Sequence, residues 1–469
     1  MKNPEASLDT IRFGTDGWRA KVAETFTFPN VRRAAYGLGV TLKKQKKSCM
    51  VFVGYDTRFY SDKFAQAAAE VLAGLGHKVI LASRLLPTPA LSLAIKAKKA
   101  DAGVMITASH NSGAYNGFKI KLPPGVSAPS SFTQQVEKNL PKEAPAITKE
   151  MKIPKTDWLP FYLETLRSKV DLTAIKKAGL KVVVDPMHGV GQRQFEGLVA
   201  GGRTQVRTVA GDRDVFFGGR QPEPIGPNLG PLSKAIKAWK ADVGFATDGD
   251  GDRIGMMDEK GNFVDVHKLH ALLLYHLWVN RGMRGGIVKT VSGTLMIDRM
   301  ARRWGIPIHV TPIGFKYIGE VMLREDILLG LEESGGIAVK GHLAERDGLL
   351  SGLLLLEALV YMKKTVAEAV AFLQKEFGPF YSGRIDLENI SFDRQAKVLG
   401  KLKKSPPPTV AGHRVTGVNA RDGVKLELEK GWLLVRASGT EPLLRLYAEA
   451  PSPKEVQALL NAAKKIAGS

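Results

Sequence analysis

One pattern recurs three times along the chain and constrains the fold most strongly: an apolar, strand-like run that ends in a polar turn. The three runs are "CMVFVGYDT" (49–57), "LKVVVDPMHGVG" (180–191) and "GGIVKTVSGT" (285–294). After the first run, the pattern predicts a helix that begins at Ser61 and ends at Gly74 or Gly76. Strand, polar turn and helix together form the unit of a parallel sheet that is buried on both faces. Their spacing of about a hundred residues predicts three related α/β domains.

The C-terminal part of the chain has a different pattern. Prolines in "SPPPTVAGHRV", from Ser405, interrupt the chain, and "GVKLELEKGWLLVRASGTEPLLRLYAEA" then predicts strands joined by a Lys-Gly turn. The last segment, "SPKEVQALLNAAKKIAG", predicts a capped helix. This tail is therefore expected to be a smaller α+β domain. We place the four domains at 1–155, 156–256, 257–370 and 371–469.

Composition limits the classes of partner. The chain of 469 residues carries a net charge of +22, which suits anionic partners such as phosphorylated metabolites. The single cysteine, Cys49, cannot form an internal disulfide, so we expect a reducing cytoplasm. The beginning of the chain, "MKNPEASLDT", has no apolar signal-peptide core. "LLSGLLLLEALVYM", from Leu349, is interrupted by Glu357 and is shorter than the roughly 20 residues that span a membrane, which predicts a buried core helix.

An acidic loop, "TDGDGDR" (247–253), follows the strand-like "ADVGFA". We expect this loop to be extended, so that Asp248, Asp250 and Asp252 project to the same side and can bind one hard cation. A solvated acidic turn is the alternative, but three neighbouring carboxylates repel one another without a cation. An EF-hand is excluded, because Arg253 stands where that loop needs glycine and the flanks are predicted strands.

Three other loops carry polar groups that suit a phosphorylated sugar. "TASHN" (107–111) puts Ser109 and His110 after an apolar run, so the serine is either a nucleophile or part of a turn. "RASGTEP" (436–442) combines an arginine, hydroxyls and flexible amides, as a phosphate site would, although a plain hairpin turn is the alternative. "GLEESGG" (330–336) offers carboxylates and a hydroxyl to sugar hydroxyls, or is an ordinary polar turn.

Together these loops predict one chemistry. A serine at a strand end, a cation-binding loop and a separate phosphate site are what phosphoryl transfer through a phosphoserine requires. The cation neutralises charge on the transferring group, and the remote site positions the substrate's other phosphate.

The loops resemble those of the α-D-phosphohexomutases, closest to the bacterial phosphoglucomutases and phosphomannomutases. "TASHN" with "YNGFK", "DGDGDR", "GLEESGG" and "RASGTEP" occur in the family's order between Arg19 and Pro442. The resemblance implies an α/β fold of three similar α/β domains with mixed sheets plus a smaller C-terminal α+β domain around a central cleft. Each domain would contribute one loop to this cleft.

The resemblance also implies roles for individual residues. Ser109 matches the serine that carries the phosphoryl group, and His110 is expected to support its loop by hydrogen bonding. No other residue completes a nucleophilic triad with Ser109. The remaining matches are Asp248, Asp250 and Asp252 as Mg²⁺ ligands together with an oxygen on Ser109; Arg19, Lys119 and Arg253 as positive groups around the phosphoserine; Glu332 and Ser334 as the sugar-hydroxyl loop; and Arg436, Ser438, Gly439 and Thr440 as the distal phosphate loop.

The implied reaction moves phosphate between C1 and C6 of a hexose phosphate, with glucose 1-phosphate to glucose 6-phosphate as the expected pair. It passes through the phosphoserine and a hexose 1,6-bisphosphate, which is also the expected activator. A general base must accept the hydroxyl proton, and Lys119, His342 and Arg346 are the candidates. Family members often carry lysine where Arg346 stands, and an arginine is a poor base because it stays protonated.

Several residues bear on which hexose is used. "EESGG" and "GHLAERDG" resemble the glucose-preferring branch of the family. The bifunctional mannose/glucose branch usually has histidines where Phe315 and Gly336 stand, and phosphoglucosamine mutases differ more around the serine loop. Ser112 and Gly113 stand where most members have two prolines, which predicts a looser loop.

Two other classes of function compete with a mutase. A metal-dependent phosphomonoesterase would also use a phosphoserine, but it would release phosphate to water and would need no remote phosphate site. A nucleic-acid-binding protein would suit the positive charge, but the sequence has no pattern of interleaved aromatic and basic residues. We therefore expect a cytoplasmic monomer or dimer whose partner is a phosphosugar, without nucleic acid or membrane partners.

Overall fold

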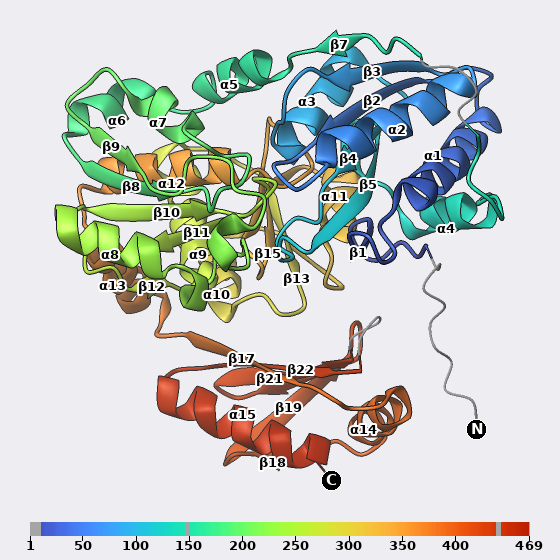
Figure 1. Cartoon of the computed structure of the whole chain (residues 1–469). Coiled ribbons are helices and arrows are strands. Elements are labelled where there is room, and N and C mark those ends of the chain that lie inside the picture. Colours follow the sequence, from blue (N-terminus) through green and yellow to red (C-terminus); the bar gives the residue numbers. More distant parts are fainter. Residues whose placement is uncertain (1–10, 147–150, 438–441, 469) are drawn as a thin grey trace. The chain divides into compact units, whose positions relative to one another are not determined.

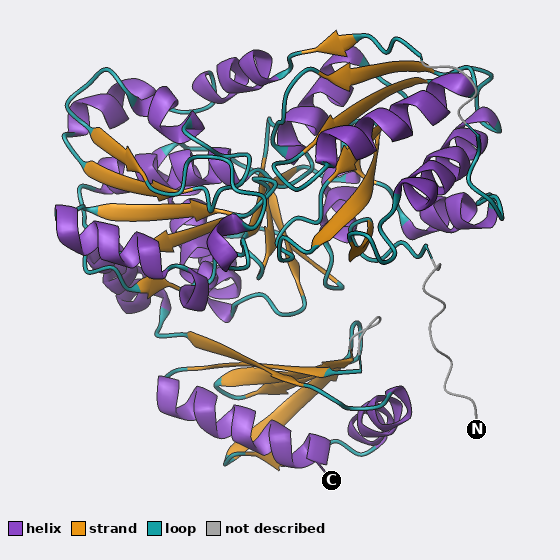
Figure 2. Ribbon diagram, viewed as in Figure 1, coloured by secondary structure: helices purple, strands orange, loops and turns teal. Residues whose placement is uncertain are grey.

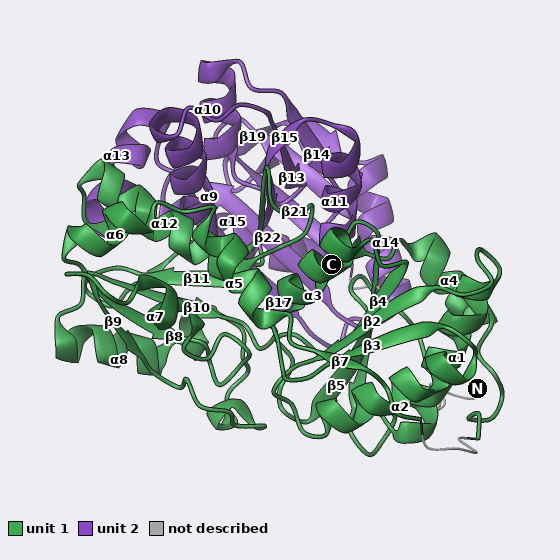
Figure 3. Ribbon diagram, turned by 90° about the horizontal axis from the view of Figure 1, so that it is seen from above, with its two compact units in different colours: residues 1–264, 334–366 green, residues 265–333, 367–469 purple. Residues whose placement is uncertain are grey.

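The protein forms two compact units, shown in different colours in Figure 3. The computed structural model describes residues 11–146, 151–437 and 442–468. Unit 1 contains Met1–Val264 and Ser334–Val366, and unit 2 contains Asp265–Glu333 and Ala367–Ser469. The chain therefore leaves unit 1, builds part of unit 2, and returns to unit 1 before it completes unit 2.

The first sheet of unit 1 is mixed and has seven strands. In spatial order they are β1 (Trp18–Lys21), β5 (Tyr115–Leu122), β4 (Ala102–Ile106), β2 (Met50–Tyr55), β3 (Lys78–Ala82) and β7 (Lys155–Thr156), with β6 (Val126–Ser127) beside β5. Strands β4, β2, β3 and β7 are parallel, whereas β1 and β5 run antiparallel to their neighbours. The helices of this region are α1 (Phe28–Lys43), α2 (Ser61–Gly74), α3 (Thr88–Lys98) and α4 (Ser130–Lys138).

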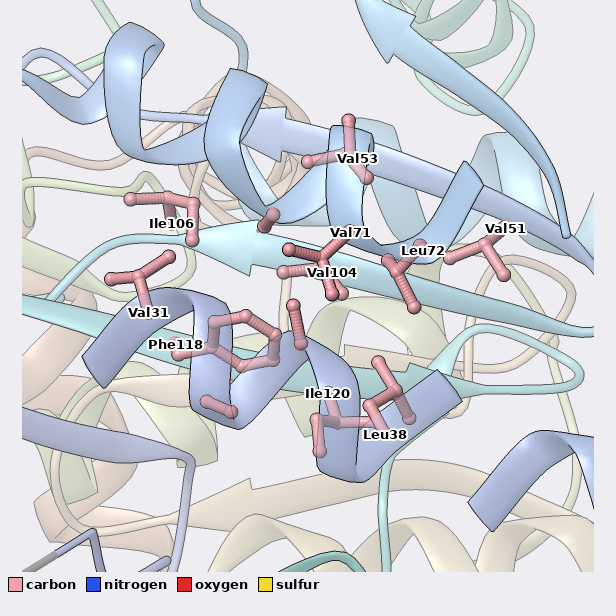
Figure 4. Close-up of a cluster of buried hydrophobic side chains, with 14 of the residues drawn as sticks. Val31, Leu38, Val51, Val53, Val71, Leu72, Val104, Ile106, Phe118 and Ile120 are labelled. Carbon is pink, nitrogen blue, oxygen red and sulfur yellow. The ribbon is translucent and has the colours of Figure 1, made fainter. Parts of the chain in front are cut away.

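Apolar side chains cover both faces of this sheet. On one face, Val53 belongs to a buried cluster with Leu72 of α2, and Figure 4 shows the cluster between strands and helices. On the other face, Phe52 stacks on Trp158 with ring centroids 4.7 Å apart. Adjacent strand residues point to opposite faces, so burial of both explains why β2 reads as a continuous apolar run. The predicted strand at 49–57 and the helix from Ser61 are confirmed.

The second sheet of unit 1 has five strands and is also mixed. Their spatial order is β12 (Phe263–Val264), β11 (Ile254–Met257), β10 (Val243–Thr247), β8 (Lys181–Asp185) and β9 (Gln205–Thr208). Strands β9, β8 and β10 are parallel, and β10 and β11 form an antiparallel pair. The helical segments of this region are α5 (Leu159–Arg167), α6 (Leu172–Ala178), α7 (Gln194–Val199), α8 (Gly230–Trp239), and two short 3₁₀ turns at Phe217–Gly219 and Gly226–Asn228.

The segment that returns to unit 1 contains β16 (Gly336–Val339) and α12 (Gly348–Met362). Helix α12 is buried on nearly all sides, as its leucine-rich sequence predicts. Its one carboxylate, Glu357, is fully buried and accepts a 2.8 Å hydrogen bond from the backbone N–H of Asp171. Among the described residues, no helix has the length and apolar character needed to cross a membrane.

Unit 2 contains a parallel α/β region and a C-terminal antiparallel sheet, and Figures 1 and 2 show their elements. The α/β strands of unit 2 are, in spatial order, β14 (Ile308–Thr311), β13 (Gly286–Thr290) and β15 (Ile327–Glu332). Its helices are α9 (Val266–Tyr275), a π-helical turn at His276–Asn280, α10 (Leu295–Trp304), α11 (Phe315–Arg324) and α13 (Val366–Phe377).

The C-terminal sheet has six strands and carries two helices. In spatial order the strands are β17 (Tyr381–Leu387), β22 (Leu444–Ala450), β21 (Gly431–Ala437), β20 (Val424–Leu428), β19 (His413–Asn419) and β18 (Thr409–Val410), and the helices are α14 (Phe392–Lys404) and α15 (Pro453–Gly468). The α/β class, with a smaller α+β domain at the C-terminal end, is therefore confirmed. The boundaries near 155, 256 and 370 stay our proposal.

Candidate active site

The serine loop leaves the first sheet between β4 and β5. Ser109 is almost completely buried and has a left-handed backbone with φ 53°. Its N–H donates a 2.9 Å hydrogen bond to Thr107 Oγ1, which supports this conformation locally. Non-glycine residues adopt this backbone region at a cost that the surroundings must offset, and such residues gather at functional sites. The geometry therefore marks Ser109 as more than an ordinary turn residue.

The acidic loop joins the antiparallel strands β10 and β11. An EF-hand loop lies between helices, so the observed strands agree with the exclusion of an EF-hand. Our expectation of an extended backbone is wrong, because the loop is a tight turn with Gly251 at φ 74°. Asp248 Oδ1 stabilises the turn by accepting hydrogen bonds from the N–H groups of Asp252 and Arg253, at 2.9 and 3.1 Å. The predicted convergence still holds: one oxygen from each of Asp248, Asp250 and Asp252 lies within 4.8 Å of the others.

Hydrogen bonds join the acidic loop to α3, to β5 and to the serine loop. Ser109 Oγ donates to Asp248 Oδ2 at 2.9 Å. Thr88 Oγ1 donates to Asp250 Oδ2 at 2.6 Å, from the first turn of α3. Lys119 Nζ, on β5, lies 2.7 Å from Asp250 Oδ2 and 3.2 Å from Asp252 Oδ2. The serine, the three carboxylates and this lysine therefore form one buried cluster within unit 1.

Three arginines complete the positive side of the cluster. Arg346 Nη2 lies 2.9 Å from Asp252 Oδ2. Arg19 donates a 2.9 Å hydrogen bond to the side chain of Asn111, in the serine loop. Arg253 follows the acidic loop directly and pairs with Glu223 at 3.3 Å. The structure thus brings the predicted cations Arg19, Lys119, Arg253 and Arg346 to the same place as Ser109.

A carboxylate that the sequence analysis missed lies at the centre of these cations. Asp16 Oδ2 is 2.7 Å from both Lys119 Nζ and Arg346 Nη2, and 3.9 Å from Arg19. Burial opposes ionisation of Asp16, but the attraction of Lys119 and Arg346 outweighs it and lowers the pKa of the carboxyl well below its usual range. The only sequence signal was its place in "FGTDGWRA", three residues before Arg19.

A second buried pair, also missed, extends the network. Lys121 follows Lys119 on the same side of β5, and its Nζ lies 2.6 Å from Glu345 Oε2. Glu345 also accepts hydrogen bonds from the N–H and hydroxyl of Ser127, at 3.1 and 2.7 Å. Because Glu345 precedes Arg346, this pair fixes the backbone that presents the arginine.

Burial and neighbouring charges shift the ionisation of the central groups. Burial, with the negative charges of Asp252 and Asp250, raises the pKa of Asp248 well above its usual value. Burial alone would lower the pKa of Lys119, but Asp16 and Asp250 outweigh it and raise that pKa, so the lysine stays protonated. Burial, with Arg253 and other cations nearby, lowers the pKa of His110 well below its usual value, so its ring is neutral.

The carboxylates fit a divalent cation. Asp250 Oδ1 and Asp252 Oδ1 are buried and have no hydrogen-bond partner among the described residues. Unpartnered buried carboxylate oxygens are costly, and oxygen donors are the ligands that Mg²⁺ prefers. The three aspartates can therefore hold the ion, with the Ser109 hydroxyl beside Asp248.

The remaining predicted site residues lie in other segments of the chain or outside the residues that the structure describes. His342 is buried in unit 1, where its Nε2 lies 2.9 Å from Asp347 Oδ2. Ser334 also belongs to unit 1, whereas Glu332 ends β15 in unit 2. Arg436, on β21 of unit 2, donates a 2.9 Å hydrogen bond from Nε to Asp422. Three predicted residues lie outside the described ranges: Ser438, Gly439 and Thr440.

Four family models match the chain in order. They describe the three alpha/beta/alpha domains and the C-terminal domain of phosphoglucomutase/phosphomannomutase, and they match residues 10–146, 160–261, 265–377 and 388–466. Together these segments cover most of the chain and include both loops of the buried cluster.

Individual relatives match over nearly their whole length. A phosphoglucomutase/phosphomannomutase of Thermococcus kodakarensis is 30% identical over 470 residues, covering 97% of this chain and 98% of the relative. A phosphoglucosamine/phosphogalactosamine mutase of Sulfurisphaera tokodaii is 30% identical over 461 residues, covering 97% and 98%. A crystal structure described as a putative phosphomannomutase from Thermus thermophilus is 36% identical, with a TM-score of 0.88, covering 98% of this chain and 99% of that one.

Proposed function

The chain belongs to the phosphoglucomutase/phosphomannomutase family of α-D-phosphohexomutases and is a phosphohexomutase, and we propose that it interconverts glucose 1-phosphate and glucose 6-phosphate. One observation carries the proposed mechanism: the buried hydroxyl of Ser109, a residue with a left-handed backbone, donates a hydrogen bond to a carboxylate of the aspartate cluster. We further propose that Ser109 carries the phosphoryl group and that Asp248, Asp250 and Asp252 hold Mg²⁺.

In the proposed reaction, the free hydroxyl of a hexose monophosphate attacks the phosphorus on Ser109. The bond between phosphorus and Ser109 Oγ breaks as the bond to the sugar oxygen forms, and Ser109 becomes an alcohol again after it takes up a proton. The product is a hexose 1,6-bisphosphate, which turns around and returns its other phosphate to Ser109. Added 1,6-bisphosphate activates the enzyme, because it phosphorylates Ser109 by the same step.

Residues of the cluster stabilise the charge of this step. When Mg²⁺ is bound, it neutralises negative charge on the transferring group. Arg19, Lys119 and Arg253 surround Ser109 with positive charge that is already oriented before the reaction. Asp16 keeps Lys119 and Arg346 in place and limits their mutual repulsion.

The proton of the attacking hydroxyl needs an acceptor, and the three candidates differ. Lys119 is held protonated by the carboxylates around it, and Arg346 is a permanent cation, so both act as charge stabilisers. His342 is paired with Asp347 at 2.9 Å. Because Lys119 and Arg346 both stay charged, His342 stays our proposed candidate for the general base.

The phosphate that does not react is proposed to bind the loop that begins at Arg436. Arg436 would bind this phosphate through its guanidinium. The backbone amides and the hydroxyls in Ser438, Gly439 and Thr440 would donate further hydrogen bonds to it. Glu332 and Ser334 would bind sugar hydroxyls. The "EESGG" and "GHLAERDG" sequences support glucose, whereas relatives with other names leave mannose and glucosamine phosphates as alternative substrates.

A substrate panel tests the proposal. The panel contains glucose, mannose and glucosamine phosphates, each with a trace of the matching 1,6-bisphosphate. Each reaction is assayed for isomer formation and for free phosphate. We expect isomer without free phosphate, with the highest kcat/KM on glucose phosphates. Free phosphate as the main product would indicate a phosphatase, and a higher kcat/KM on another hexose would replace glucose in the proposal.

A further inference from the structure

Arg58 lies behind the serine loop and binds four of its carbonyl oxygens. Its side chain is fully buried. Nη2 donates hydrogen bonds of 2.7 Å to the carbonyls of Ser109 and Asn111. Nη1 donates to the carbonyls of Ser112 and Tyr115, at 2.7 and 2.9 Å. One guanidinium therefore contacts the loop from its serine to the start of β5.

The fifth N–H donor of the Arg58 guanidinium binds a carboxylate close to Arg58 in the sequence. Nε donates at 3.0 Å to Asp56 Oδ2. The other oxygen of Asp56 accepts from the N–H of Arg58 and from Ser61 Oγ, at 3.0 and 2.8 Å. The ring of Phe217 lies 4.7 Å from the guanidinium carbon. Because a guanidinium has five N–H donors in a fixed plane, five acceptors fix its position and, through it, the shape of the loop.

Residues that follow β9 of the second sheet contact both the serine loop and the backbone of Arg58. A Cβ on Gly113 would lie 2.7 Å from the carbonyl oxygen of Val215 and 2.8 Å from Phe216 Cα, so the loop approaches this backbone too closely for a larger residue. Arg213 Nε donates at 2.9 Å to the carbonyl of Thr57, and its Nη2 donates at 3.2 Å to that of Arg58. These contacts restrain the segment that carries Ser112 and Gly113 and the backbone of Arg58. The looser loop expected from the missing prolines stays a prediction.

We propose that Arg58 is a positioning residue for phosphoryl transfer at Ser109, and that Arg213 supports it by fixing the backbone of Arg58. This inference rests on the proposed function of Ser109. Arg58 reaches the loop through backbone carbonyls, so its effect is on where the Ser109 oxygen lies. A displacement of about 1 Å at a reacting atom can reduce a rate by about 100-fold. A lysine in place of Arg58 would keep the charge but cannot bind four carbonyls in one plane.

The test compares Arg58→Lys with Arg84→Lys, the same substitution at an exposed arginine that pairs with Asp157 at 3.6 Å. Each protein is phosphorylated with glucose 1,6-bisphosphate, and transfer from phospho-Ser109 to glucose 6-phosphate is followed in a single turnover. For Arg58→Lys we expect the rate constant per phosphorylated enzyme to fall about 100-fold, with KM changed by less than about threefold. The ³¹P resonance of the phosphoserine should also shift. Arg84→Lys should match the wild type in all three measurements.

A merely structural role would lower the folded fraction without changing the rate constant of the phosphorylated molecules. If Arg58→Lys does not fold, Arg213→Met decides, because this exposed side chain can be replaced without uncovering a buried charge. It should slow transfer by about 10-fold, the effect of losing two hydrogen bonds. An unchanged rate constant in a folded variant of either residue overturns the inference. If the wild type itself forms no phosphoserine and no bisphosphate, the proposed function fails and this inference fails with it.

Discussion

The hydroxyl of Ser109 donates a 2.9 Å hydrogen bond to Asp248 Oδ2, although 139 residues separate the two along the chain. Because the proposed covalent route needs this oxygen, Ser109→Ala should lose mutase activity by roughly four orders of magnitude or more. Intact-protein mass spectrometry should find one phosphate on the wild type and none on the variant. The exposed Ser168→Ala should behave as the wild type. A phosphate on another residue would overturn the assignment.

Asp250→Asn tests the cation site. The change removes one negative charge from three converging carboxylates, so Mg²⁺ should bind more weakly and turnover should fall roughly 100-fold or more. Calorimetric titration with Mg²⁺ measures the binding without any substrate. Asp212→Asn removes the same charge at an exposed position of unit 1 and serves as the control. Unaltered Mg²⁺ affinity in Asp250→Asn would exclude this carboxylate as a ligand.

Asp16→Asn tests the centre of the cation network. Loss of this carboxylate leaves Lys119 and Arg346 without the partner that lies 2.7 Å from each. Removing one partner of a buried ion pair costs about 3–5 kcal/mol, so the free energy of unfolding should fall by that order. Chemical denaturation measures it, with Glu24→Gln, from an exposed pair with Lys21, as the control. Equal stability of the two variants would show that Asp16 is dispensable to the network.

Arg436→Ala tests the distal phosphate site and separates a mutase from a phosphatase. Truncating one partner of a charge pair costs roughly 2–4 kcal/mol, so kcat/KM should fall about 30-fold to 1000-fold for both monophosphates. The bisphosphate should escape more often, so the variant should need more added activator. Arg414→Ala, at an exposed residue of the same sheet, is the control. A variant with normal isomerisation and normal activator demand would assign Arg436 a structural role only.

Lys425 gives unit 2 a dependence on pH. Burial, together with Lys289, lowers its pKa to about 8, and its Nζ donates a 2.8 Å hydrogen bond to the carbonyl of Val291. In the unfolded state Lys425 has the ordinary lysine pKa of 10.5. As the pH rises, the folded state therefore loses this proton before the unfolded state does. Between these two pKa values the unfolded state binds more protons than the folded state, so the free energy of unfolding rises with pH. Below about pH 8 the lysine is charged in both states, and the folded state bears the full cost of the buried charge.

The contribution is at most about 3 kcal/mol. Thermal unfolding from pH 7 to 10.5 should show the Tm of the wild type rising relative to that of Lys425→Met. Lys430→Met removes an exposed lysine in the turn between β20 and β21, and it should follow the wild type at every pH. A constant Tm difference between the wild type and Lys425→Met would show that Lys425 does not titrate in this range.

The sequence predicted the elements of the fold better than the arrangement of charges. Continuous apolar runs are local signals, so β2, β8, β13 and the buried helix α12 were all predicted. The meeting of the three aspartates was also predicted, but for the wrong reason, because a turn rather than an extended strand brings them together.

Contacts between distant residues left no local signal. Asp16 and Arg346 are 330 positions apart, and only the folded chain shows that they share an ion pair. Arg58 directly follows a strand-like run that ended in "YDT", and its role depends on carbonyl oxygens, which every residue has. A residue that binds backbone atoms cannot be predicted from the side chains of its partners.

The return of α12 to unit 1 determines the order in which a newly synthesised chain can fold. Strands β8, β10 and β11 leave the ribosome long before Gly348, where the helix begins, yet α12 packs on β10, β11 and α6. Until the helix emerges, the apolar surface that it covers is exposed to water, a state that favours aggregation. Unit 1 can therefore mature only after Asp265–Glu333 has been translated. A nascent chain that stalls within that segment is a natural substrate for a chaperone, whereas one that stalls after Met362 already contains every element of unit 1.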